Sequence, residues 1–388
     1  MTYRDQPPRP LIEQIPDYRD DLDVSDEEDS FYARDDDFLI PPKLQAAITR
    51  TSDRIPRRIK RYSLTYLAIF VLFLISWWTY LGPRRAVYKA ELHLMDNTPT
   101  MSYGNNVRPA FKGMIQVSDM DEQHLPNHHN RLIFVGDVHG CREELEHLLK
   151  KLDFNHKHDH VVLVGDMIAK GPDSPGVIKL AQKIGASCVR GNWEDKLLLS
   201  IAEAEDRHML LAPDSDDENA KIDFLDDQSA AHANPKLRHL AKQFSKKQIA
   251  YMSQCPVILR VGTVPHLGSL VAVHAGLVPD TPLQDQDPFH VMNMRSIDLK
   301  TRIPSSKHGG TPWEKFWNHR QQKLKHEDRT TVVYGHNRKK GLNVHEYSWG
   351  LDTGCASGGK LTALVVDGRG QTEIVHVKCG KEGGYESA

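Results

Sequence analysis

The chain has 388 residues, of which 39% are hydrophobic and 26% are charged, and its formal net charge is -2. This is an ordinary globular mixture, long enough for one large domain or two smaller ones. The near-neutral total gives no reason to expect a nucleic acid or another polyanion as a partner from overall charge, so any basic groove must be local.

Charge is nevertheless uneven in the N-terminal region. Residues 1–40 contain thirteen Asp or Glu against four Arg, and residues 1–61 lack a periodic apolar pattern, so we expect a disordered tail. Within it, DDDFLI (Asp35 to Ile40) resembles the acidic dileucine signals that clathrin adaptors read, which makes a clathrin adaptor a candidate partner. Ser25 and Ser30 could accept phosphate, although a solvated acidic run is the simpler interpretation.

Residues 62–81, YSLTYLAIFVLFLISWWTYL, form a run without a charge. A helix of that length rises about 30 Å, close to the hydrocarbon thickness of a bilayer. A buried core helix is the alternative, but the flanks RRIKR and PRR and the aromatic residues at both ends favour a transmembrane segment. No small-residue cleavage pattern follows, so we expect a retained signal anchor. The excess of basic residues before it predicts a cytosolic N-terminus and a lumenal or external C-terminal portion.

Residues 82–129 are expected to be a linker and lead-in to a folded domain at 130–380. Six apolar runs predict strands, at 131–135, 160–164, 186–190, 270–273, 331–334 and 361–366, and helical patterns alternate with them. Such alternation is typical of layered α/β domains. Two stretches, 203–227 and 281–328, are acidic or irregular, and we expect them to be loops or lids inserted into the domain.

The cysteines are scattered, at positions 141, 188, 255, 355 and 379, with no CxxC pair. Their spacing predicts neither a structural zinc site nor a disulfide framework. One disulfide would be compatible with an oxidising lumen, and the odd number leaves at least one thiol free or paired with another chain.

Polar motifs follow five of the predicted strands. They read GDVHG, GDMIAKGP, GNWED, HAGLVP and GHN in chain order. Because ligands gather at the carboxyl ends of strands in open α/β sheets, these loops should converge and bring together Asp137, His139, Asp166, Asn192, His274 and His336. Such a set suits Zn²⁺, Mn²⁺, Co²⁺ or Fe²⁺, with zinc favoured, and two metal ions sharing a carboxylate suit the hydrolysis of phosphate esters and anhydrides.

Each motif also has a plainer interpretation when it is taken alone. A Gly-Asp pair after a strand is usually a turn, and a single His after a strand is more often a core residue than a ligand. The fixed order of all five motifs on strand ends is what favours a shared site.

These motifs, in this order, resemble the PPP superfamily of metallophosphoesterases, which includes protein Ser/Thr phosphatases and bacterial diadenosine tetraphosphatases. GDMIAKGP and LDTGCASGGKLTALVV (351–366) are more similar to the latter. With its N-terminal anchor, the chain also resembles the fungal vacuolar endopolyphosphatases of this superfamily. The resemblance implies an αββα sandwich of the calcineurin-like type, a vacuole membrane location, and divalent-metal-dependent cleavage of internal phosphoanhydride bonds of inorganic polyphosphate.

The resemblance also implies residue roles. Asp137 and His139 would bind the first metal ion, Asp166 would bridge to the second, and the second would be held by Asn192, His274 and His336. A hydroxide held between the two ions would attack phosphorus.

Two cations stand at or near the positions where the family commonly uses arginines to hold phosphate. Lys170 occupies the first, and Arg295, in NMRSID, is the candidate for the second. Lysine keeps the attraction for phosphate but lacks the bidentate geometry of arginine.

Trp193 departs from the family pattern, in which the third motif is GNH and its His is the general acid. Ala169 stands where the protein phosphatases have the Asp that orients that His, so the acid and its partner are missing together. A phosphate leaving an anhydride is a much weaker base than a serine alkoxide and needs less protonation. We therefore hypothesise a phosphoanhydride substrate; alternatively, Trp193 covers the site and another residue donates the proton.

Three functions compete. The leading prediction is an endopolyphosphatase. A dinucleotide polyphosphate hydrolase or a lumenal phosphoprotein phosphatase is the alternative, and a catalytically inactive receptor or scaffold is a third, which the presence of all six expected ligands disfavours.

Overall fold

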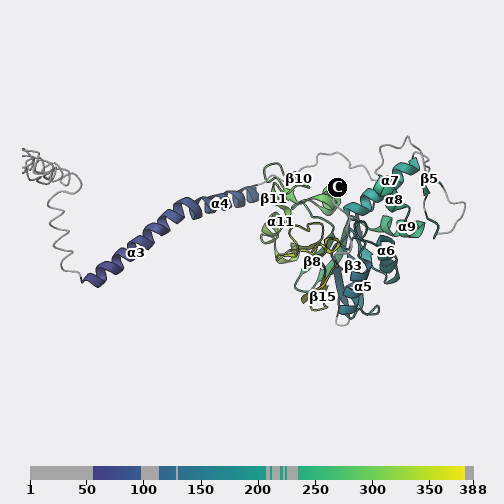
Figure 1. The fold of residues 1–388 in the computed structure, drawn as a ribbon, viewed down its shortest axis with the longest axis horizontal. Coiled ribbons are helices and arrows are strands. Elements are labelled where there is room, and N and C mark those ends of the chain that lie inside the picture. The colour runs from purple at the N-terminus through teal and green to yellow at the C-terminus, as the bar shows by residue number, and fades with distance from the viewer. Residues whose placement is uncertain are drawn as a thin grey trace, which may run out of the picture. The chain divides into compact units, whose positions relative to one another are not determined.

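The computed structural model describes residues 56–97, 113–127, 130–206, 210–211, 219–221, 223–224 and 235–380 (Figure 1). The acidic tail, Ser25, Ser30 and the DDDFLI motif lie outside the described residues. Residues up to Lys89 form one compact unit and residues from Ala90 onward form another, and each is described by itself.

The predicted transmembrane segment is helical. Helix α3 (Arg57–Ser76) continues through a π-helical turn (Trp77–Leu81) into α4 (Gly82–Asn97). Its apolar side chains, such as Leu72 and Phe73, are exposed, and by length and composition it can cross a membrane. The helix is longer than predicted, because residues 82–97 extend it where a linker was expected.

The end of α4 packs within the second unit. Met95 is buried, the Glu91 carboxylate lies 2.5 Å from the Lys315 ammonium, and Asp96 pairs with His319 at 2.5 Å. The last turns of this helix are therefore part of the folded domain.

Two sheets form the centre of the second unit. The first has the order β16-β15-β2-β3-β4, and its strands are Thr372–Lys378, Lys360–Val366, Arg131–Val135, Asp159–Leu163 and Ser187–Cys188. The second has the order β1-β7-β8-β12-β14-β13, and its strands are Val117–Asp119, Ile258–Val264, Gly268–Val273, Thr330–Tyr334, Ser348–Gly350 and Asn343–Val344. Strands β2, β3 and β4 pair in parallel, as do β8, β12 and β14.

The two sheets pack face to face. Alternate residues of β2 and β3, such as Phe134 and Val162, share one buried cluster with Leu270 of β8 and Val333 of β12. The intervening residues of each strand point the other way, because side chains alternate across a strand.

Helices cover the outer faces. Those on the β2–β3 sheet are α5 (Arg142–Lys151), α6 (Ser174–Lys183), α7 (Asn192–Asp206), α8 (Pro235–Ala241) and α9 (Lys246–Gln254). Those on the β8–β12 sheet are α10 (Pro288–Asn293) and α11 (Trp313–Gln321), together with the end of α4. The layers confirm the predicted αββα sandwich.

The stretch 281–328 is not a plain loop, so that expectation is wrong. It carries α10, α11 and a small sheet of β9 (Ser296–Ile297), β10 (Pro304–Ser305) and β11 (Thr311–Pro312). Trp313 and Phe316 of α11 are fully buried. Within 203–227, the described residues hold the end of α7, a two-stranded ladder of β5 (Leu210–Leu211) and β6 (Asp223–Phe224), and Asn219 to Lys221.

The domain contains two disulfides, which corrects the expectation that the cysteines form no framework. Cys188 of β4 pairs with Cys255 after α9, and Cys355 pairs with Cys379. Cys141 is a free, buried thiol. The partners are 67 and 24 residues apart in the chain, so sequence spacing could not reveal them.

We expect the Cys188→Ser, Cys255→Ser double variant to lose about 4 kcal/mol of unfolding free energy, because the disulfide closes a long loop and restricts the unfolded chain. Urea denaturation followed by circular dichroism measures this loss. Cys141→Ser is the matched control, since it replaces a thiol that closes no loop. An equal loss in the control, or no effect of a reducing agent on the parent protein, would contradict the prediction.

Candidate metal centre

The six predicted ligands lie together at the carboxyl ends of strands from both sheets. Asp137 and His139 follow β2, Asp166 follows β3, Asn192 begins α7, His274 follows β8 and His336 follows β12. All six are buried, with 0 to 9% of each residue exposed. The sequence prediction that these residues converge is therefore correct, since the strand ends of two packed sheets meet at one edge.

The backbone of these loops is unusual. His139, Asp166 and His336 all have positive φ angles, of 48°, 48° and 65°, a region that side chains with a Cβ rarely adopt. The glycines are needed for close approach, because a Cβ on Gly335 would lie 2.0 Å from Asp137 Oδ1. Strained backbone of this kind persists only where the surroundings enforce it.

Two overlapping groups of ligand atoms can be distinguished. One comprises Asp137, His139 and Asp166, and the other Asp166, His274 and His336; within each group the ligand atoms lie within 4.8 Å of one another. Asp166 is common to both: its Oδ2 is 3.4 Å from His139 Nε2 and its Oδ1 is 3.3 Å from His274 Nε2. The Asn192 amide lies 3.1 Å from His274 Nε2, beside the second group.

Electrostatics within the cluster are strongly perturbed. Burial, together with the charges of Asp352 and Asp166, raises the pKa of Asp137 well above its usual value. Burial opposes the charged form of His274, but Asp166 and Asp137 outweigh it and raise its pKa to about 10. Burial and the neighbouring His274 lower the pKa of His336. The carboxyl groups of Asp137 and Asp166 thus share a buried site where water does not screen their charges.

This donor set fits divalent metal ions. Adjacent buried carboxylates favour a bound cation, because isolated buried charge is costly, and imidazole with carboxylate suits Zn²⁺, Mn²⁺, Co²⁺ or Fe²⁺. A carboxylate shared between two groups is the arrangement expected for a pair of ions.

The two predicted phosphate-holding cations reach the cluster from different loops. Lys170 Nζ lies 2.6 Å from His139 Nε2. Arg295 is half-buried, and its Nη2 donates to the backbone oxygen of His336 at 3.4 Å. Burial lowers the pKa of Arg295, while the carboxylates of Asp352, Asp166 and Asp137 oppose that shift.

Glu194 is a site residue that the sequence reasoning missed. It is fully buried, and its carboxylate accepts four backbone N–H groups, from Asp166, Met167, Ile168 and Gly191, at 2.8 to 3.2 Å. Burial, reinforced by the charge of Asp166, raises its pKa to about 7. Because it ties the loop after β3 to the loop before α7, Glu194 is a positioning residue for Asp166 and Asn192.

Asp352 was also missed, although its motif, LDTG, was part of the family resemblance. It is buried and close enough to Asp137 and Arg295 to influence the pKa of each. Its Oδ1 accepts the Gly354 N–H at 3.1 Å. The signal available in the sequence was a carboxylate directly after a short strand in the second sheet.

Trp193 stands where the family resemblance implies a histidine. Its backbone N–H donates to Asp166 Oδ1 at 3.0 Å, and its ring packs against the core. The ammonium groups of Lys170 and Lys196 lie 5.4 and 5.0 Å from the ring centroid. Ala169 is buried in the adjoining loop, so no carboxylate stands there to orient an acid.

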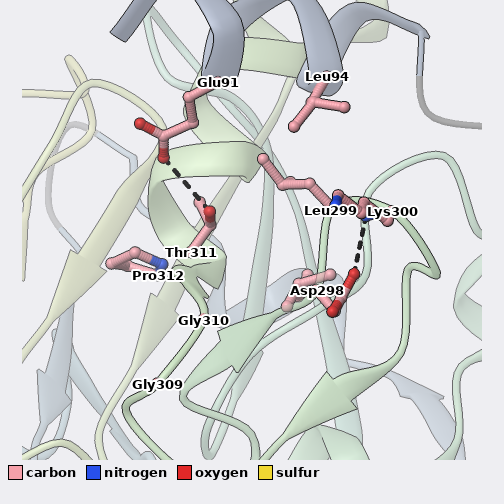
Figure 2. A pocket seen from close by; sticks show the side chains of 10 residues that line it. Glu91, Leu94, Asp298, Leu299, Lys300, Gly309, Gly310, Thr311 and Pro312 are labelled. Atoms are coloured by element: carbon pink, nitrogen blue, oxygen red, sulfur yellow. Dashed lines mark hydrogen bonds between the residues drawn. The ribbon is translucent and has the colours of Figure 1, made fainter. Parts of the chain in front are cut away.

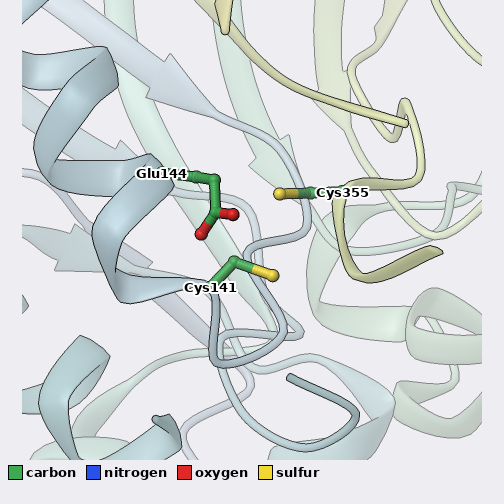
Figure 3. A group of neighbouring side chains, drawn as sticks. All are labelled: Cys141, Glu144 and Cys355. Carbon is green, nitrogen blue, oxygen red and sulfur yellow. The ribbon is translucent and has the colours of Figure 1, made fainter. Parts of the chain in front are cut away.

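Two other features of the described residues are separate from this cluster. Figure 3 shows Cys141, Glu144 and Cys355 as neighbours, but Cys355 is bonded to Cys379 and offers no thiolate, so we assign no metal there. A pocket of about 450 Å³ lies between α4 and the β9–β11 sheet (Figure 2), where Glu91 and Thr311 share a hydrogen bond. None of the six ligands lines it.

Two face-packed sheets that present overlapping carboxylate and imidazole groups at their strand ends define a metal-dependent phosphoesterase. The family model for calcineurin-like phosphoesterases matches residues 130–356, and the chain belongs to this family. It is a hydrolase of phosphate esters or anhydrides.

Individual relatives differ in the substrates that their names give. The chain is 24% identical over 345 residues to a zinc-dependent endopolyphosphatase of Saccharomyces cerevisiae, covering 82% of this chain and 98% of the relative. It is 28% identical to a symmetrical bis(5'-nucleosyl)-tetraphosphatase of Janthinobacterium, covering 63% and 95%. A crystal structure provisionally described as a diadenosine tetraphosphatase is 31% identical, with a TM-score of 0.52, covering 69% of this chain and 99% of that one.

We expect Glu194→Gln to lower the free energy of unfolding by roughly 3 kcal/mol, because an amide NH₂ would face backbone donors and leave them unsatisfied. Metal content should fall with it. Thermal denaturation and elemental analysis measure the two effects. Glu143→Gln, an exposed residue in the first turn of α5, is the control; equal behaviour of the two variants would refute the positioning role of Glu194.

Chelation should destabilise the domain, because it would remove the divalent charge that best compensates the buried carboxyl groups of Asp137 and Asp166. Zn²⁺ added at about one hundred times its dissociation constant should then raise the unfolding free energy by about 3 kcal/mol. Melting curves of metal-free and reloaded protein test this. Asp166→Asn removes the carboxylate common to both groups and should abolish the gain; a full gain in that variant would rule out a shared ligand.

Proposed function

We propose that the protein is a divalent-metal-dependent endopolyphosphatase that hydrolyses internal phosphoanhydride bonds of inorganic polyphosphate. The observation that carries this is the Trp193 site, where Trp193 stands in place of the histidine that the family resemblance implies, while Lys170 and Arg295 lie beside the candidate ligands His139 and His336. The name and the coverage of the yeast relative support the same substrate.

The metal ions would be held as the two groups suggest. Asp137 and His139 would bind one, His274, His336 and Asn192 the other, and Asp166 both. Zinc is favoured by the yeast relative's name. Two such ions activate a water molecule and polarise phosphoryl oxygens.

The protein's own groups would orient the substrate. Lys170, beside His139, and Arg295, beside His336, approach the cluster through residues of different groups. Cations placed in this way attract phosphoryl oxygens and stabilise charge that develops on them. Glu194 would act through the loops, by fixing Asp166 and Asn192 in place.

The absence of a histidine at position 193 favours an anhydride over an ester. A phosphate leaving group ionises near neutral pH, whereas an alkoxide is a much stronger base and gains far more from protonation as it leaves. The site is therefore better suited to polyphosphate than to phosphoserine.

A dinucleotide polyphosphate is the second candidate substrate. It also contains anhydride bonds, so the leaving-group argument applies equally, and the bacterial relatives and the solved structure carry that name. Substrate length, and not bond type, separates the two candidates.

We further propose a single-pass anchor with a cytosolic N-terminus and a catalytic domain in the vacuole lumen. The apolar helix from Arg61 to Asn97 and the basic residues that precede it support the anchor and its orientation. Two disulfides support an oxidising compartment. The vacuole itself rests on the resemblance to fungal endopolyphosphatases.

The full chain, solubilised in detergent, should shorten long-chain polyphosphate to intermediate lengths on a gel when Zn²⁺, Co²⁺, Mn²⁺ or Mg²⁺ is supplied in turn. Asp166→Asn should be inactive because both ligand groups lose their common member. Release of terminal phosphate without intermediates would indicate exo cleavage. Intact polymer under every metal, with diadenosine tetraphosphate cleaved in parallel, would replace this substrate with the second candidate.

Trp193→His should alter substrate selectivity, since it restores an imidazole at the acid position. We expect a gain of hydrolysis of an alkyl phosphoester, such as a phosphoserine peptide, of about a hundredfold, at the low end of general acid effects. Polyphosphate cleavage should change less. Trp193→Phe controls for loss of the indole, and unchanged rates on both substrates would remove support for the leaving-group argument.

A further inference from the structure

We propose that surface cations extend the metal centre into two arms that hold a long polyphosphate chain, with Lys196 as the outer cation of one arm and Lys339 as the outer cation of the other. The proposal rests on the proposed function and deepens it, because it identifies residues that would select chain length. The inner cations are Lys170 and Arg295, already described.

The first arm runs from His139 along the start of α7. Lys170 contacts His139 at 2.6 Å, and both Lys170 and Lys196 place their ammonium groups against the Trp193 ring, at 5.4 and 5.0 Å. Both lysines are exposed. The Trp193 ring thus lies beside two ammonium groups, at a position where the family resemblance implies a proton donor.

The second arm runs from His336 across the β9–β11 sheet. Arg295, just before β9, donates to the His336 oxygen at 3.4 Å and through Nη1 to the Ser306 oxygen at 3.0 Å. Ser296 Oγ then donates to the Lys307 oxygen at 2.6 Å, which fixes the loop between β10 and β11 beside Arg295. Lys307 and His308 in this loop are exposed.

The loop after His336 adds the outer part of this arm. It reads NRKK, and Arg338, Lys339 and Lys340 are exposed. His308 is near enough to Arg295, Lys339 and Lys340 for their charges to lower its pKa, although burial is the larger cause and Glu314 opposes the shift. Because Arg295 donates to backbone oxygens of both Ser306 and His336, the loop that carries His308 and the loop that carries Lys339 both contact it, although they are separated in the chain.

The cations of the second arm differ in whether a neighbouring side chain contacts them. Lys340 contacts the Glu314 carboxylate, and Arg338 contacts the Ser357 hydroxyl. Asn337, between His336 and this run, is buried, and its Oδ1 has no hydrogen-bond partner. Lys339 is the exposed cation that best suits contact with a flexible polyanion.

The two arms attach at residues that the two ligand groups do not share, His139 and His336. A polymer cut internally carries phosphates on both sides of the broken bond, so an endo-acting enzyme gains from cations on both sides. A short substrate would reach Lys170 and Arg295 alone. Only a longer chain would also contact Lys196 and Lys339, and polyanion contacts of this kind weaken with added salt.

The test compares Lys196→Glu, Lys339→Glu and the double variant in the full, detergent-solubilised chain. Steady-state KM and kcat are measured with long-chain polyphosphate and with tripolyphosphate. We expect the double variant to raise KM for the long chain roughly tenfold, equal to about 1.4 kcal/mol, and to raise KM for tripolyphosphate far less. Lys183→Glu, an exposed residue in the last turn of α6, is the matched control. An equal rise in KM for both substrates, or no change in KM, would overturn the proposal of two arms.

A binding measurement separates failure of the arms from failure of the proposed function. Asp166→Asn protein is titrated with long-chain polyphosphate, with and without the two charge reversals and at two salt concentrations. Weaker binding and a smaller salt dependence in the reversed protein support the arms even if the parent cuts no polymer. Unchanged binding would overturn the proposed arms even if the parent protein cuts polyphosphate. Equal competition by a single-stranded oligonucleotide of the same charge would also overturn them.

Discussion

Two buried carboxylates, Asp137 and Asp166, face the same imidazoles, and the cost of placing these charges together constrains the rest of the domain. Asp137 follows a strand of one sheet, whereas His274 and His336 follow strands of the other. The distance between them is therefore set by how the two sheets pack. The cluster shared by Phe134, Val162, Leu270 and Val333 is the apolar layer that holds this distance.

Local backbone strain is the second consequence of bringing these groups together. His139, Asp166 and His336 adopt positive φ angles, which costs on the order of 1 to 3 kcal/mol at each position. Glu194 offsets part of this, since one carboxylate satisfies four backbone N–H groups from two loops. Its own burial is unfavourable, as its raised pKa indicates. The same burial allows Glu194 to hold the backbone of Asp166 in place.

The convergence of the six candidate ligands could be predicted because each lies shortly after a strand that sequence periodicity reveals. Glu194 could not, because an acidic residue in the first turn of a helix is ordinary, and only the structure shows that it is buried against the next loop. The small sheet of β9, β10 and β11 was missed because two-residue strands carry no periodic signal. Trp313 and Phe316 were the available hint that 281–328 contributes to the core. The disulfides were missed because their pairing depends on sheet packing.

The cations near Trp193 also bear on how a leaving group could depart without a histidine at position 193. In an ester hydrolysis the leaving alkoxide is a strong base, so its departure gains most from a proton donor. In an anhydride hydrolysis the leaving phosphate carries charge that cations can stabilise directly. Trp193 stands where the family resemblance implies a proton donor, and the ammonium groups of Lys170 and Lys196 lie against its ring, so this position offers positive charge in place of an acid. Such an exchange favours a substrate whose leaving group is itself a phosphate chain.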